Sequence, residues 1–148
     1  MNNMRLNKET QYALLLGMYL ARSGRSTIGT VVANLNLSTS FLHKVANNLR
    51  RRGILESTRG PGGGFELAKD VRIIDIFNSM DGNGFMSQRE RLLFAAGVPE
   101  ERMLELIISN MSLAIWPVLN KTLKQFVSEL TQTELKQLNT LTAESLEQ

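Results

Sequence analysis

Residues 59–67 read RGPGGGFEL and place four of the 11 glycines of the chain within five positions around a proline. Two interpretations compete for such a stretch: a loop that cradles a phosphate, or the turn of a β-hairpin. A phosphate-binding P-loop requires Lys and then Ser or Thr after its last glycine, whereas Phe65 and Glu66 follow here. A dinucleotide fingerprint requires glycines that open a helix, and FELAKD (65–70) does not open one well.

The segments on both sides of the glycines have the apolar placement of short strands. Ile54 begins ILEST (54–58), and Phe65 and Leu67 lie in FEL (65–67). Glycine favours the tip between such strands because positive φ angles cost it little. The stretch therefore predicts a hairpin that projects from the domain as a wing.

Two short helices joined by a tight turn are predicted directly before the hairpin. Ser26 or Thr27 can cap the first helix, Ser38 can cap the second through its hydroxyl, and Gly53 ends it. Apolar residues recur at helical spacing in both segments: Val31, Val32 and Leu35, then Phe41, Leu42, Val45, Ala46 and Leu49. This pattern predicts a helix-turn-helix, a weak signal by itself because helix pairs with short turns are common.

Further helices are predicted on either side of this unit. A helix of about five turns over residues 6–24 precedes it, with Gly24 where a stop is expected. A short helix over residues 71–82 follows the hairpin and should pack on the core through Ile73, Ile76, Phe77 and Met80. Glycines at 82 and 84 mark a boundary, so we divide the chain into residues 1–82 and 83–148.

The second part is predicted to be helical throughout. A capping box of Ser87 and Glu90 predicts an extra helix that ends near Gly97. Apolar residues then recur in steps of three and four over residues 100–130, which predicts a long helix that Pro117 kinks or splits. We interpret its apolar stripe as a dimer surface, although a helix that folds back on its own domain has the same periodicity. The residues assigned to this surface are Ile108, Met111, Ile115, Leu119, Leu123 and Phe126.

Composition narrows the class of protein. The chain is 43% hydrophobic and 21% charged, as is ordinary for a soluble globular protein. We find no apolar run near the roughly 18 residues of a membrane span and no apolar core of a signal peptide, so we expect a cytoplasmic protein without a membrane partner. The chain has no cysteine and one histidine, His43, which excludes disulfides, thiolate metal sites and a Cys/His zinc site. We therefore expect no metal and no cofactor.

The net charge of +3 is unevenly distributed along the chain. Residues 1–82 hold 11 bases against six acids, a balance of +5, whereas residues 83–148 hold six bases against eight acids, a balance of −2. A basic first part indicates contact with a polyanion, although a solvated basic face would give the same count.

The run TIGTVVANLNLSTSFLHKVANNLRRRGILESTRGPGGGFELAK (27–69) resembles the winged helix-turn-helix of the Rrf-two (Rrf2) family of transcription regulators. The most specific mark is RGPGGG followed by an aromatic, one short strand after the recognition helix. IWPVLNKTLKQFVSELTQTEL (115–135) looks like the dimerisation helix of the family and adds Trp116 to the dimer surface. The resemblance implies a mainly α fold with a small β-hairpin wing and a long C-terminal dimerisation helix.

The resemblance breaks between Gly82 and Ser112. Cluster-binding relatives typically carry three cysteines there, and this chain has none. Ligand chemistry therefore rules out an iron–sulfur cluster held in the way of the family. In its place we expect an effector, a small molecule or a protein, to act on residues 83–110.

The resemblance implies that residues 1–82 bind double-stranded DNA, as half of a homodimer on a palindromic operator, and family habit favours repression. Base edges should be read from the first turns of the recognition helix, where Thr39, Ser40 and His43 are the preferred readers. The triplet Arg50–Arg52 can grip phosphates, although cations there also complement the helix dipole.

Arg59 at the wing tip is the residue we most expect to enter the minor groove or meet phosphate, because the glycines let the hairpin approach the duplex closely. An arginine that is merely solvated on an exposed turn is the alternative. The complete set of predicted DNA-binding residues is Ser38, Thr39, Ser40, His43, Lys44, Arg50, Arg51, Arg59, Gly60, Gly62 and Gly63.

Other functions have less support from the residues. His43 lacks a second His or Cys nearby for a metal site, and a pH switch rests on it alone. Glu90, Glu100 and Glu101 lack a nucleophile–base pair, so we do not expect an enzyme. The competing class is a protein-interaction module of the same fold that docks on a metabolic enzyme.

Overall fold

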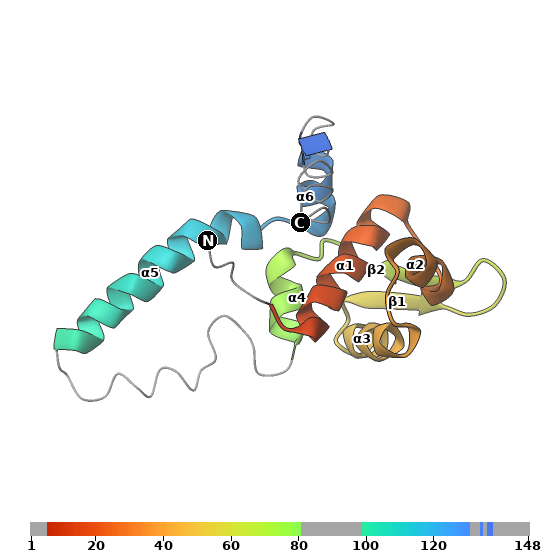
Figure 1. The fold of residues 1–148 in the computed structure, drawn as a ribbon, viewed down its shortest axis with the longest axis horizontal. Coiled ribbons are helices and arrows are strands. Elements are labelled where there is room, and N and C mark those ends of the chain that lie inside the picture. The colour runs from red at the N-terminus through yellow and green to blue at the C-terminus, as the bar shows by residue number, and fades with distance from the viewer. Residues whose placement is uncertain (1–5, 81–98, 131–133, 135, 138–148) are drawn as a thin grey trace, which may run out of the picture.

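The computed structural model describes residues 6–80, 99–130, 134 and 136–137. Helices α1 to α4 gather around the base of the two-stranded hairpin, whose loop projects beyond them, and α5 extends away on the opposite side (Figure 1). The elements in chain order are α1 (Lys8–Ser23), α2 (Ile28–Leu35), α3 (Thr39–Arg51), β1 (Leu55–Thr58), β2 (Gly64–Leu67), α4 (Ile73–Ser79), α5 (Pro99–Leu119) and α6 (Leu123–Glu129). The predicted fold class, mainly α with a small β-hairpin wing, is confirmed.

The first two helices begin and end at residues with clear local causes. The Asn7 side chain accepts a hydrogen bond from the Thr10 amide at 2.8 Å at the start of α1. Gly24, with φ of 73°, ends this helix where the stop was expected. Thr27 caps α2 by accepting from the Thr30 amide at 3.2 Å, so Thr27, not Ser26, is the cap.

The core is formed by the apolar stripes of α1, α3 and α4. The α3 stripe is buried at Leu42, Val45, Ala46 and Leu49, as its periodicity predicts. In α2, Val31 is fully buried and Leu35 partly. The α4 residues assigned to the core, Ile73, Ile76, Phe77 and Met80, are all buried. Since α1 contacts both α3 and α4, the helix-turn-helix and the helix after the wing share one core.

The long helix predicted over residues 100–130 is two helices. Pro117 lies inside α5, which ends at Leu119, and α6 begins at Leu123. The break has a physical cause in Thr122, whose hydroxyl accepts from the Gln125 amide at 3.0 Å while the Gln125 side chain accepts from the Thr122 amide at 3.0 Å. Backbone hydrogen bonds from Ile73 to Lys121 and from Leu123 to Val71 then fix the junction against the segment before α4.

Two residues assigned to the dimer surface belong to the core of this chain. Leu119 is 7% exposed and Leu123 is 1% exposed. Leu123 reaches α1 so closely that a Cβ on Gly17 would lie 2.8 Å from its Cδ1 atom. The assignment of Leu119 and Leu123 to a dimer surface is therefore corrected, because α6 folds back on α1.

The other residues of that set are less buried. Met111 and Trp116 are exposed, whereas Ile115 and Phe126 are half-buried against the core. Ile108 lies in α5, but its side chain is outside the described residues, as are the predicted capping box at Ser87 and the boundary at residues 82–84.

Helix α5 exposes apolar side chains along most of its length. Those that are 42–73% exposed are Met103, Leu104, Leu106, Ile107, Met111, Leu113, Trp116 and Val118. The window Arg102–Leu119 has a mean hydropathy of 1.3, is 6% buried and is long and apolar enough to cross a membrane by length and composition. The expectation that no segment of this kind exists is corrected, although one such helix is weak evidence for a span.

Replacement of Leu123 by Ala should lower the free energy of unfolding by about 2–5 kcal/mol, because it empties a fully buried site between α1 and α6. Urea denaturation measures the change. Lys124→Ala, at an exposed position of the same helix, serves as control and should change stability by less than about 0.5 kcal/mol. Equal stability of the two variants would contradict the packing of α6 on α1.

Candidate DNA-binding interface

The start of α3 is held by a residue of α1. Ser38 is the N-cap by position, but its hydroxyl makes no capping hydrogen bond, which corrects the expected role of that side chain. Its hydroxyl lies 3.5 Å from that of Ser40, and its amide donates to the Tyr12 hydroxyl at 3.1 Å. The Tyr12 ring also packs edge-on against Phe41, with centroids 4.8 Å apart. Tyr12 therefore positions the helix that carries the predicted base readers.

One face of α3 is free of the core. Thr39, Ser40, His43, Lys44, Arg50 and Arg51 are all exposed, while the apolar stripe of the same helix is buried. Asn47 is exposed as well and lies one turn after His43. An asparagine on such a face can pair with the edge of adenine. Asn47 is not among the residues predicted from the sequence, although its spacing of four from His43 indicates the same face of the helix.

Lys44 has an acidic neighbour on α1. Its ammonium group lies 3.5 Å from the Glu9 carboxylate, and the two side chains are 71% and 35% exposed. An ion pair this exposed contributes roughly 0–1 kcal/mol. Lys44 can therefore leave Glu9 for another anion at small cost.

The glycines of residues 60–64 are required by the shape of the wing. The strands pair antiparallel, with Leu55 opposite Leu67 and Thr58 opposite Gly64. The Gly63 amide donates to the Gly60 carbonyl at 2.9 Å and closes the tip. A Cβ on Gly63 would lie 2.3 Å from the Thr58 carbonyl oxygen, a distance that real Cβ atoms do not reach. The predicted hairpin is thus confirmed.

The base of the wing is joined to the connection between α1 and α2. Ser26 and Phe65 exchange two backbone hydrogen bonds of 2.9 and 2.8 Å. Gly64 permits this approach, since a Cβ there would lie 2.5 Å from the Ser26 carbonyl oxygen. An ion pair of 2.7 Å between Arg25 and Glu66 lies beside it. The orientation of the wing is therefore fixed against the helices.

Arg59 directly follows β1 and is exposed. It makes no ion pair or side-chain hydrogen bond with any residue in the described part of the chain. Its guanidinium is thus available to an external anion. With Lys44, Arg50 and Arg51 on α3, it gives the wing and the recognition helix a common positive charge.

The described residues offer no place for a metal ion. Within the described ranges, no three His, Asp or Glu side chains gather closely enough to hold one, and the full chain has no cysteine. An iron–sulfur cluster therefore does not fit the donor set of this chain.

A helix-turn-helix with a hairpin wing and an exposed basic face defines a winged-helix DNA-binding protein. The Rrf2 family, described as "Iron-dependent Transcriptional regulator", matches residues 6–140, and the chain belongs to this family. It is a DNA-binding transcription regulator and not an enzyme, as the sequence predicts.

Curated relatives of the chain are also named as transcriptional regulators. A provisionally named HTH-type transcriptional regulator of Neisseria meningitidis serogroup A is 28% identical over 140 residues, which cover 92% of this chain and 90% of that protein. The HTH-type transcriptional regulator IscR of Cronobacter sakazakii is 30% identical over 84 residues, covering 53% of this chain and 52% of its own length.

Solved structures share the fold. CymR, the global cysteine regulator of B. subtilis, superposes with a TM-score of 0.68 at 24% identity, covering 87% of this chain and all of that one. T. potens IscR superposes with a TM-score of 0.56 at 18% identity, covering 88% of this chain and 94% of that one. At these identities the likeness establishes the fold.

Replacement of Gly64 by Ala should destabilise the protein by about 1–3 kcal/mol and weaken DNA binding, because the new Cβ collides with the backbone that anchors the wing. Thermal unfolding and fluorescence anisotropy on DNA measure the two effects. Gly29→Ala is the matched control: it lies in α2, where a Cβ would meet only Thr27 Oγ1 at an ordinary 3.9 Å, and it should stabilise the helix by up to about 1 kcal/mol. Effects of the same sign in both variants would contradict the role of Gly64.

Proposed function

We propose that this protein is a sequence-specific repressor that binds a palindromic operator as a homodimer and works without an iron–sulfur cluster. The observation that carries the proposal is the exposed polar and basic face formed by α3 and the wing. Both parts of that face are anchored to α1 or its connection to α2, through Tyr12 and Ser26, so they can meet a duplex as one surface.

We assign different contacts to different parts of this face. Thr39, Ser40 and His43, in the first turns of α3, read base edges in the major groove. Arg50 and Arg51, at the other end of α3, contact phosphates, which sets the register without reading sequence. The wing brings Arg59 to the minor groove or its phosphates, with Gly60, Gly62 and Gly63 letting the tip come close.

The dimer is supported by α5. Its exposed apolar residues extend from Met103 to Val118, and an exposed apolar surface of this extent is typical of an interaction site. A second copy of the chain would cover this surface, including Met111, Leu113 and Trp116. Two-fold symmetry would then present two α3 helices to half-sites about 34–36 Å apart.

We assign DNA binding to residues 1–82 and dimerisation to residues 83–148, the two parts expected from the sequence. The two parts remain mechanically connected, since α6 packs on α1. We also propose that the protein acts in the cytoplasm, because DNA is its proposed partner.

Arg59→Ala should weaken binding to the operator by about 1–3 kcal/mol, because it removes a wing contact with the duplex. Fluorescence anisotropy on duplex DNA from upstream of the gene, with a scrambled duplex and two salt concentrations, measures the change. The matched control is Arg22→Ala, an exposed arginine in the last turn of α1 near α6, which should change affinity little. Equal losses of operator affinity in the two variants would show only the effect of net charge. Weak, salt-insensitive DNA binding by the wild type would favour the protein-interaction module.

Leu113→Asp should convert the dimer to a monomer, because Leu113 is 73% exposed in the single chain and a carboxylate cannot be buried there unpaired. Light scattering after size-exclusion chromatography measures the mass, and operator affinity should fall with it. Asn78→Asp, exposed on α4, adds the same charge away from α5 and should leave the mass unchanged. A monomeric wild type, or one recovered only in membranes, would overturn the dimer.

A further inference from the structure

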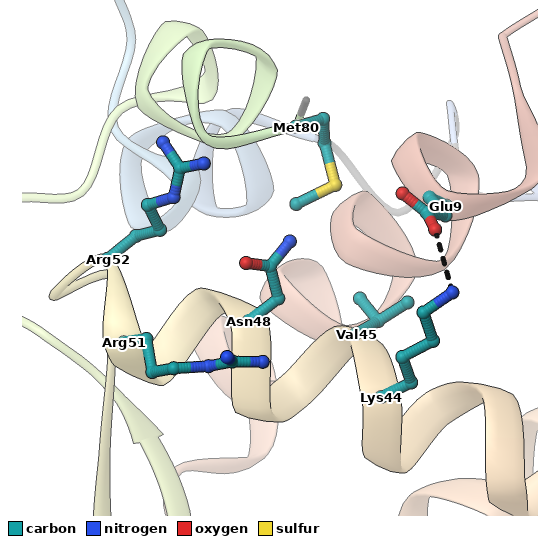
Figure 2. Close-up of a pocket in the computed structure, with 7 residues that line it drawn as sticks. All are labelled: Glu9, Lys44, Val45, Asn48, Arg51, Arg52 and Met80. Atoms are coloured by element: carbon teal, nitrogen blue, oxygen red, sulfur yellow. Dashed lines mark ion pairs between the residues drawn. The ribbon is translucent and has the colours of Figure 1, made fainter. Parts of the chain in front are cut away.

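A polar cavity of about 430 Å³ lies beside the recognition helix, between α3, the start of α1 and the residue after α4 (Figure 2). It is lined by Glu9, Lys44, Val45, Asn48, Arg51, Arg52 and Met80. In Figure 2, Lys44 reaches from α3 to Glu9, Asn48 points toward Met80, and Arg51 lies along the helix. We propose that this cavity binds a small organic anion that lowers the affinity of the protein for DNA.

The charge of the lining favours an anion. Three cationic side chains face the cavity against the single carboxylate of Glu9. Arg52 makes an interaction of its own. Arg51 donates from Nε to the Asn47 carbonyl at 3.4 Å, so we count the Lys44 ammonium and the two terminal nitrogens of Arg51. The Lys44–Glu9 pair is 3.5 Å long and exposed, so an incoming carboxylate or phosphate group can replace Glu9 as the partner of Lys44.

The uncharged lining residues give the cavity a hydrogen-bond donor and an apolar wall. Asn48 is half-buried, and its side-chain amide has no hydrogen bond to any residue that the structure describes. Its NH₂ group can therefore donate to the anionic group of a ligand. Val45 and Met80 are 2% and 3% exposed and give the cavity an apolar wall. A small molecule with an apolar part and one carboxylate or phosphate group fits this combination of lining residues.

The position of the cavity couples the ligand to DNA. Lys44 and Arg51 belong both to the cavity and to the residues that we assign to DNA, so this inference rests on the proposed function. An anion held by these two side chains removes them from the duplex and adds negative charge beside the recognition helix. The bound ligand would therefore release the operator. Glu9 and Asn48 line only the cavity, which lets the two roles be separated.

The test uses phenyl phosphate and benzoate, which combine an anionic group with an apolar ring. Binding to the DNA-free wild-type chain is measured by calorimetry, with potassium chloride at equal ionic strength as reference. Asn48→Ala should weaken binding about tenfold through loss of a hydrogen bond to a charged group. Glu9→Gln should strengthen it, since the competing carboxylate is gone. Asn48→Ala should leave operator affinity unchanged when no probe is present.

The outcomes distinguish this inference from the proposed function. Saturable binding with these opposite variant effects, and loss of operator affinity beyond that in potassium chloride, would support the cavity as an effector site. Absence of saturable binding of both probes at millimolar concentration, or equal binding by all three proteins, would overturn it. A loss of operator affinity in probe-free Asn48→Ala would show instead that the cavity contacts a DNA phosphate. Because the calorimetry uses no DNA, its result stands whether or not Arg59→Ala affects the operator.

Discussion

The pair of backbone hydrogen bonds between Ser26 and Phe65 is the constraint on which the binding face depends. It joins the wing to the connection between α1 and α2, so the hairpin cannot swing independently of the helices. The pairing exists only because position 64 lacks a Cβ, which would collide with the Ser26 carbonyl. The nearby Arg25–Glu66 pair is exposed and adds little stability by comparison. Four of the five positions from 60 to 64 are therefore glycine for reasons of shape, before any contact with a ligand.

Helix α1 is the common reference for both parts of the face. It holds the start of α3 through the Tyr12 hydroxyl and leads into the segment that holds the wing through Ser26. Glu9 of the same helix contacts Lys44 and forms one side of the polar cavity. A change at α1 can thus reach the recognition helix through direct contacts. The effector site that we propose would act through these contacts and would need no metal.

The apolar residues of α5 and α6 have the same helical spacing in the sequence, but some are buried in the structure and others are exposed. Leu119 and Leu123 are buried in the core, Leu123 against Gly17 of α1, while Leu113 and Trp116 of α5 are exposed. The capping box at Thr122 starts α6, which runs in a different direction from α5 (Figure 1). The exposed residues Leu113 and Trp116 of α5 can contact a partner, whereas Leu119 at the end of α5 and Leu123 in α6 complete the core of the monomer.

The sequence by itself determined the local elements of this protein. The caps and stops at Thr27, Gly24 and Gly53, the helical stripes and the hairpin all follow from turn chemistry and a 3.6-residue period, which act over a few neighbouring positions. The absence of cysteine in the sequence likewise excludes an iron–sulfur cluster held by cysteine ligands. Only the tertiary structure decided that Tyr12 holds the amide of Ser38, 26 residues away, and that Ser26 pairs with Phe65. It also decided which leucines of the last helices are core and which residues enclose a cavity. Contacts of this kind depend on how helices pack against one another, and no local pattern in the chain encodes that packing.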